Sequence, residues 1–131
     1  MNKNKKNVLN YPEITIPQHG KITKITSGIY WVRMPLPFKL DHINLWLLKD
    51  EYLGIKGWSI VDTGICNLKT KKLWLKIIER YCDKLPILRI FCTHMHPDHF
   101  GLAHWFCNGL NKKLCFPELW MANSEFLTGT F

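Results

Sequence analysis

The sequence has no long hydrophobic run. No apolar stretch in its 131 residues approaches the ~20 residues that a membrane helix needs, and the longest candidate, residues 43–48, ends at three charged residues. The N-terminal segment is rich in Lys and Asn and has no apolar region typical of a signal peptide. We therefore expect no membrane association and a cytoplasmic location.

The sequence also lacks the cysteine spacing of a disulfide framework or a thiolate metal site. Its 5 cysteines are odd in number and form no Cys-x-x-Cys pair. They are Cys66, Cys82, Cys92, Cys107 and Cys115. We expect scattered free thiols in a reducing compartment.

Acidic residues are few, with 10 Asp and Glu against 18 Lys and Arg, which gives a formal net charge of +8. Such a balance raises the alternative of a nucleic-acid partner. However, Lys69, Lys71, Lys72 and Lys76 fall on one predicted helix, where solvated lysines are ordinary. Aromatic and basic residues are not interleaved as in a single-strand binding surface. We therefore do not expect a nucleic-acid partner.

The residues that are present indicate one globular domain. Apolar residues make up 47% of the chain, and the length suits one core and not two. Residues 1–20, punctuated by Pro12, Pro17 and Gly20, form a predicted lead-in segment. Residues 21–131 form the predicted domain.

Hydrophobic periodicity predicts strands followed by one strand–helix–strand step. Trp74, Ile77 and Ile78 recur at helical spacing after Asn67, a plausible N-cap. The expected strands are 21–26, 28–34, 42–48, 58–62, 88–93 and a small one at 114–116. The expected helices are 67–82, 98–108 and one beginning within 117–131. This order predicts an α/β (α+β layered) domain.

Residues 93–101 read Thr-His-Met-His-Pro-Asp-His-Phe-Gly and follow a predicted strand. His94 and His96 are two apart, so in extended backbone both imidazoles point to one side. Pro97 keeps His96 out of the helical region. Asp98 and His99 then begin a helix whose first turn Asp98 is placed to cap.

Three imidazoles and one carboxylate within six residues form a ligand set that suits Zn²⁺, with Fe or Mn as alternatives. A catalytic ion keeps an open position for water and lowers the pKa of that water toward ~7. Asp98 is placed to orient or deprotonate the water, and is the predicted catalytic residue. The competing interpretation is a cluster of surface histidines beside a helix cap, with no metal.

The segment resembles the His-x-His-x-Asp-His motif of the metallo-β-lactamase superfamily, and Val-Asp-Thr-Gly at 61–64 is similar to that family's first motif. The resemblance implies that His94 and His96 bind a first metal ion, and that Asp98 and His99 bind a second. Asp62 would hold a ligand or a water in position. The resemblance also implies that the chain forms the N-terminal half of a metallo-β-lactamase-like αββα sandwich.

The function that the resemblance implies is metal-dependent hydrolysis of a small molecule. A metal-held hydroxide would attack an ester, thioester, lactone, lactam or phosphodiester. In the family, the remaining metal ligands come from a second half. After His99 this sequence offers only His104, and its downstream carboxylates are Glu118 and Glu125. Whether the chain is an enzyme is therefore left open, the alternative being a catalytically inactive truncated remnant that at most binds metal or a partner chain.

The missing half also affects the expected stability. In the family architecture the inner face of the sheet is buried against a second sheet. Exposure of several hundred Å² of that face, at ~25 cal/mol per Å², corresponds to about 10 kcal/mol of lost burial. We therefore expect the isolated chain to be unstable, to form a homodimer, or to be completed by a chain that supplies the second half.

Overall fold

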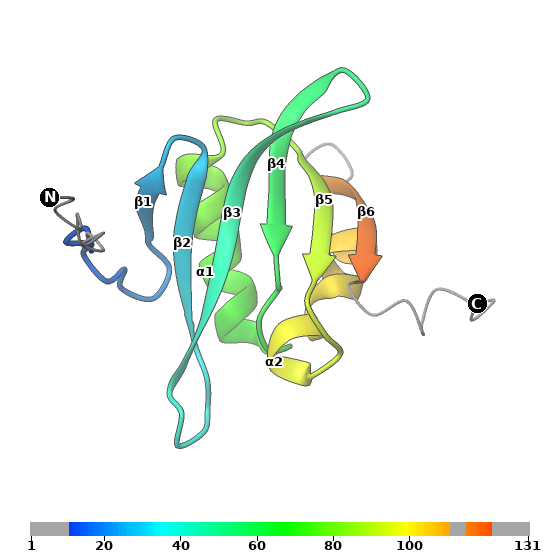
Figure 1. Cartoon of the computed structure of the whole chain (residues 1–131). Coiled ribbons are helices and arrows are strands. Elements are labelled where there is room, and N and C mark those ends of the chain that lie inside the picture. The colour runs from blue at the N-terminus through cyan, green and yellow to red at the C-terminus, as the bar shows by residue number, and fades with distance from the viewer. Residues whose placement is uncertain (1–10, 111–114, 122–131) are drawn as a thin grey trace, which may run out of the picture.

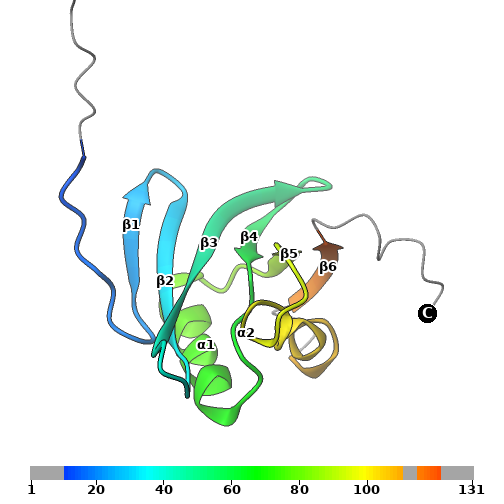
Figure 2. The ribbon, with the colours of Figure 1, turned by 60° about the horizontal axis from the view of Figure 1, so that its bottom comes forward.

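The computed structural model describes residues 11–110 and 115–121, which form one six-stranded sheet with helices on one face (Figures 1 and 2). The strands lie side by side in chain order. They are β1 (Ile22–Thr26), β2 (Ile29–Pro35), β3 (His42–Tyr52), β4 (Ile55–Val61), β5 (Ile87–Cys92) and β6 (Cys115–Met121). The helical elements are α1 (Leu68–Tyr81), the short α2 (Pro97–Phe100) and η1 (Trp105–Gly109), one turn of π-helix.

The sheet changes character at β4. Strands β1 to β4 pair antiparallel through hairpins, whereas β4, β5 and β6 pair parallel. Parallel neighbours need a crossover connection, and α1 supplies the one between β4 and β5. The α2–η1 region lies between β5 and β6 and makes a second crossover. The mixed α/β fold class expected from the sequence is confirmed.

Helix α1 begins and ends where the sequence indicates. The side chain of Asn67 accepts a hydrogen bond of 2.8 Å from the amide of Thr70, so Asn67 is the N-cap. The buried face carries Trp74, Ile77 and Ile78. At its other end Asp83 has a positive φ of 51°, which stops the helix. At 14 residues α1 is the longest helix of the described part, where no helix is long and apolar enough to cross a membrane.

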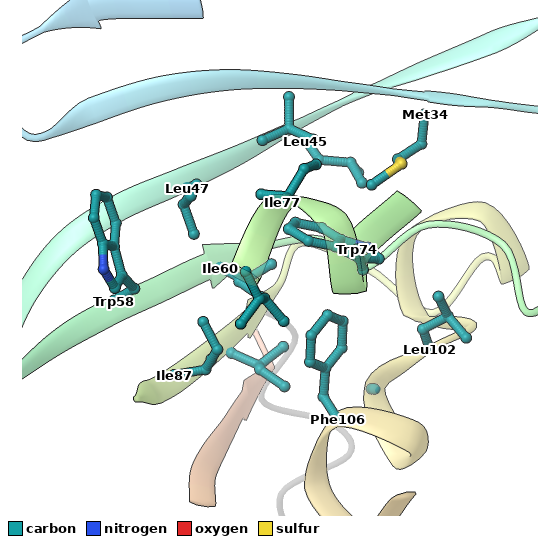
Figure 3. Packing of buried hydrophobic residues seen from close by; sticks show 14 of the residues in the cluster. Met34, Leu45, Leu47, Trp58, Ile60, Trp74, Ile77, Ile87, Leu102 and Phe106 are labelled. Atoms are coloured by element: carbon teal, nitrogen blue, oxygen red, sulfur yellow. The ribbon is translucent and has the colours of Figure 1, made fainter. Parts of the chain in front are cut away.

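The core lies between α1, η1 and one face of the sheet (Figure 3). Trp74 is fully buried and meets Phe106 edge-on, with ring centroids 5.3 Å apart. The indole Nε1 of Trp74 donates to the carbonyl of Thr63 at 2.8 Å, so this core residue also holds the loop after β4. Leu45 and Ile60 supply the sheet side of the same cluster.

The opposite face of the sheet carries no helix of the described part of the chain (Figure 2). Leu47, Ile60 and Ile90 point into the core. Because side chains alternate along a strand, the residues before and after each of them in the sequence point to this opposite face. There Arg89 donates to both carboxylate oxygens of Asp50, at 2.9 and 2.7 Å, and Ser59 also donates to Asp50. The Arg89 guanidinium holds the pKa of Asp50 below its usual range. The face is therefore partly polar; the homodimer or complementing chain expected to cover it stays a prediction.

The structure corrects three expected elements. Strand β3 runs on to Tyr52, because the hairpin turn is at Leu53 and Gly54. The prediction of a helix beginning within residues 117–131 is wrong as far as Met121, because Pro117 and the residues up to Met121 belong to strand β6. The rest of that segment is outside the described residues. The continuous helix expected at 98–108 is interrupted after Phe100, for a reason that involves the loop after β4.

The thiols of the described cysteines Cys66, Cys82, Cys92 and Cys107 are free. Burial raises the pKa of Cys82 and of Cys92 to about 12, and it also raises the pKa of Cys107. These three buried or partly buried thiols therefore stay protonated and unreactive at neutral pH.

Trp74→Ala should lower the free energy of unfolding by about 3–5 kcal/mol, because it opens a cavity and removes the bond to Thr63. Urea denaturation of the purified chain measures this loss. The neighbouring Leu75→Ala is the control, since Leu75 is 46% exposed and should cost less than about 1 kcal/mol. Equal losses for the two variants would contradict the packing described.

Candidate metal centre

The histidine-rich loop lies where β4 and β5 end. The two strands are parallel neighbours, so their carboxyl ends meet at one edge of the sheet. The loop of residues 62–67 leaves β4 there, and residues 93–96 leave β5 and lead into α2 (Figure 1). The topology thus brings together two motifs that are about thirty residues apart in the chain.

Pro97 determines where α2 begins. As the first helical residue it needs no N–H partner, and it leaves His96 in extended backbone at φ −61° and ψ 144°. The carbonyl of His96 accepts from the amides of His99 and Phe100, both at 2.9 Å. His96 is therefore the N-cap, and its side chain makes no capping bond. The expectation that Asp98 caps the first turn is wrong, because Asp98 already lies inside that turn.

Asp62 is the hydrogen-bonding centre of the site. It is only 5% exposed, and its φ of 60° lies in the left-handed region that Asp tolerates better than most residues. Its carboxylate accepts from the Thr93 amide at 2.8 Å, from the Thr93 hydroxyl at 2.8 Å, and contacts His99 Nδ1 at 2.8 Å. The Asp62 amide donates in turn to the carbonyl of Phe91. One carboxylate therefore joins the end of β4 to the start of the histidine loop and to α2.

This network fixes the tautomers of two histidines. A carboxylate only accepts hydrogen bonds, so the contact with Asp62 requires a proton on His99 Nδ1, and in the neutral ring Nε2 is then the nitrogen that can bind a metal. The Thr93 hydroxyl gives its single proton to Asp62, so it accepts from His94 Nδ1 at 2.9 Å. In the neutral ring of His94, Nε2 is then likewise the nitrogen that can bind a metal. Orientation of metal-binding imidazoles through their other nitrogen is a common feature of metal sites.

The atoms that could bind metal fall into two pairs. His94 Nε2 is hydrogen-bonded to His96 Nδ1 at 3.1 Å, and His99 Nε2 lies 3.5 Å from Asp98 Oδ2. Two ligands at ~2.0–2.2 Å from a tetrahedral zinc ion stand roughly 3.3–3.6 Å apart. The spacing of Asp98 and His99 falls in this range, and that of His94 and His96 is slightly shorter. The ring of His94 lies between those of His96 and His99, at centroid distances of 4.6 and 3.9 Å.

These donors fit zinc by chemical type, and one pair also by its spacing, but they do not close a coordination shell. Within residues 11–110 and 115–121, no three His, Cys, Asp or Glu side chains are arranged to hold one ion. His104 adds nothing to the pairs: it is exposed, and its Nδ1 accepts a hydrogen bond from Asn108 at 3.3 Å. Further ligands would have to come from water, substrate or groups outside the described residues.

Thr63 has a role that the sequence analysis missed. Its amide and hydroxyl both donate to the carbonyl of His99, at 2.7 and 2.9 Å, and its hydroxyl accepts from the amide of Leu102 at 3.0 Å. These bonds replace helical ones, which explains the interruption after α2. The Asp-Thr-Gly sequence at 62–64 was visible, but its threonine carried no signal of this contact.

Gly101 permits the close approach of the two loops. A Cβ on Gly101 would lie 2.9 Å from the carbonyl oxygen of Gly64 and 2.8 Å from the amide nitrogen of Cys66. Real Cβ atoms essentially never come so near to backbone atoms. Glycine at this position therefore lets α2 pack directly on the loop after β4.

Asp62→Asn should change the tautomer of His99 in the metal-free chain. Asn keeps the left-handed backbone and one acceptor for Thr93, but its amide N–H groups then face His99 Nδ1, which favours the Nε2–H form. Two-bond ¹H–¹⁵N correlation spectra report the tautomer directly. The free energy of unfolding should fall by about 1–3 kcal/mol.

The matched control is Asp83→Asn, an exposed aspartate that also has a positive φ, of 51°. It should leave the His99 spectrum unchanged and cost less than about 0.5 kcal/mol. An unaltered His99 tautomer in Asp62→Asn would show that Asp62 does not determine it.

Three comparisons with known proteins bear on this arrangement. A family model described as Metallo-beta-lactamase superfamily matches residues 39–123, which is more than half of the chain. The match covers β3 to β6 and both loops of the site. No curated protein matches the chain.

Two solved structures show where this fold occurs. A beta-lactamase domain protein from Burkholderia ambifaria is 49% identical, with a TM-score of 0.80, over 86% of this chain and 33% of that one. A metallo-beta-lactamase family protein from Thermus thermophilus is 30% identical, with a TM-score of 0.50, over 63% of this chain and 26% of that one. The chain thus spans about a third of the length of the Burkholderia protein. By its sequence and by its fold, the chain belongs to the metallo-β-lactamase superfamily.

Proposed function

We propose that the loop between β5 and α2 binds one or two zinc ions and forms the metal site of a hydrolase. Fe and Mn are the alternative metals. The observation that carries this proposal is the hydrogen-bonding network of Asp62, which engages Nδ1 of His99 directly and Nδ1 of His94 through Thr93, so that Nε2 of each neutral ring can bind a metal. A cluster of surface histidines beside a helix cap would not need a buried carboxylate to orient its rings. The family membership of the chain supports the same interpretation.

In this proposal each pair of side chains would hold one ion. His94 and His96 would hold the first, and Asp98 and His99 would hold the second. A bound zinc ion lowers the pKa of a water ligand toward ~7 and stabilises developing negative charge on a substrate oxygen. Asp98, with a side chain 27% exposed, would then orient a nearby water and accept a proton from it. Asp62 keeps His99 in its binding tautomer throughout.

The proposed substrate is a small molecule that carries an ester, thioester, lactone, lactam or phosphodiester bond. These bonds share a polarised centre that a water nucleophile attacks. One fold can serve many such reactions, because the loops around the metal choose the substrate. A cytoplasmic location stays a prediction, as does the absence of a nucleic-acid partner.

The alternative is a chain that binds metal or a partner chain without turnover. It draws its support from the two open donor pairs, since neither is closed by a third side chain in the described ranges. Metal binding and turnover therefore need separate measurements.

The metal-binding part predicts that zinc raises the melting temperature of the chain and binds with saturation in isothermal titration calorimetry. The double variant His94→Ala/His96→Ala should lose at least about tenfold in zinc affinity, because one donor pair is removed. His104→Ala is the control, since that exposed histidine lies outside the pairs, and it should bind zinc as the unaltered chain does. Equal affinity in the double variant would refute the assignment.

The hydrolase part predicts turnover of at least one thioester, lactone, β-lactam or phosphodiester by the zinc-loaded chain. Asp98→Asn should lower kcat by about 10²-fold or more while the chain still folds and binds zinc at the first pair. Zinc binding with no turnover of any of these substrates would overturn the hydrolase and support the non-catalytic alternative.

A further inference from the structure

A polar hollow lies beside β2, apart from the histidine loop. It has a volume of about 500 Å³ and is lined by Ile16, Pro17, Gln18, His19 and Arg33. Three of these side chains can donate hydrogen bonds, and none is acidic. The lining residues of the hollow therefore carry positive charge and no carboxylate of their own.

Arg33 is the main feature of this hollow. Its neighbours Val32 and Met34 are fully buried in the core, so strand alternation directs Arg33 away from α1. Its Nε is shielded from solvent, yet it has no hydrogen-bond partner within the described ranges. By contrast, Arg89 is held by two bonds to Asp50. A shielded guanidinium N–H without a partner is costly, and an anion bound to the same guanidinium would offset part of that cost.

The surroundings of His19 are also positive. Burial lowers the pKa of His19, and the charges of Arg33 and Lys69 lower it further. His42 acts in the same direction, and Asp41 in the opposite one. Asp41 is itself paired with His42, its Oδ1 lying 2.6 Å from His42 Nδ1. The Asp41 carboxylate therefore interacts mainly with His42, and it offsets only part of the positive charge of Arg33.

Strand register places Arg33 level with the histidine loop. Arg33 pairs with Asn44, Trp46 pairs with Val61, and Val61 pairs with Phe91. Two residues beyond this row, toward the ends of β4 and β5, Asn44, Thr63 and Thr93 lie at about the same level across the sheet. Three strand spacings of ~4.8 Å then separate Arg33 from the start of the loop by roughly 14 Å.

We propose that Arg33, with His19 and Gln18, binds an anionic group, a carboxylate or a phosphate, at one end of the substrate. The identity of the bound molecule as a substrate rests on the proposed function, but the anion site itself does not. The guanidinium donates to the anion oxygens, and the uncharged His19 ring and the Gln18 amide add neutral donors. Substrates would then carry a negative charge about 14 Å or less from the bond that is hydrolysed.

The test uses the whole chain freed of metal with EDTA, so that it does not depend on the metal centre. Inorganic phosphate is titrated in one series and succinate in another, while ¹H–¹⁵N spectra follow the Arg33 Nε–H and the His19 ring. We expect saturable shifts of both groups and a rise in the His19 pKa when the anion is bound. The stronger of the two series identifies the preferred anion.

Arg33→Gln should weaken binding of the preferred anion by about tenfold or more, as measured by calorimetry. Arg80→Gln is the matched control, because Arg80 is exposed on α1 and the substitution removes the same charge. It should change the affinity by less than about twofold. The double variant His94→Ala/His96→Ala should bind the anion as the unaltered chain does.

Equal weakening by Arg33→Gln and Arg80→Gln would show that the protein attracts anions only through its net charge, and would overturn the site. Absence of saturable shifts at Arg33 in the unaltered chain would do the same, even if the variant failed to fold. Anion binding without zinc binding would keep this site and refute the proposed hydrolase. If the chain binds the anion and is also a hydrolase, Arg33→Gln should raise the KM for an ester substrate that carries a separate carboxylate, and should leave kcat unchanged. The KM for the same substrate with that carboxylate methylated should stay the same.

Discussion

The site depends on the carboxylate of Asp62, which ties three segments together at the edge of the sheet. It receives the Thr93 amide and hydroxyl and meets His99 Nδ1, so the end of β4, the exit from β5 and the first turn of α2 share one acceptor. Because a carboxylate only accepts hydrogen bonds, its contact with His99 requires a proton on Nδ1 of that ring. A single buried charge therefore shapes both the local backbone and the chemistry of the donors.

The sequence was most informative where the structure of a segment is determined by residues within that segment. Asn67 as the N-cap of α1, the buried face at Trp74 and the clustering of the three histidines all follow from local spacing. It was least informative where two distant segments meet. The bonds from Thr63 to His99 and Leu102 replace helical bonds, and nothing in residues 98–108 alone signals that interruption. Strand β6 was misjudged past Cys115 because its pairing with β5 outweighs local helical preference.

The two faces of the sheet are built from different interactions. The face toward α1 is a closed apolar cluster, whereas the other centres on the ion pair of Asp50 and Arg89, with Ser59 as an added donor. The Arg89 guanidinium also lies over the rings of Tyr52 and Phe91, at 4.8 and 5.2 Å. A partly buried charged pair of this kind contributes little net stability, but it favours some packing partners and penalises others. Any surface that covers this face must accommodate a fixed, directional pair of charges.

The change from hairpins to crossovers at β4 has a consequence for access. Strand β3 runs opposite to β4, so at the edge where β4 and β5 release their loops, β3 contributes only its beginning, at His42. The hairpin loop of residues 36–41 joins β2 to β3 at this same edge of the sheet (Figure 1). It and the histidine loop therefore leave the sheet on one side, which makes this hairpin a natural point for variation in selectivity.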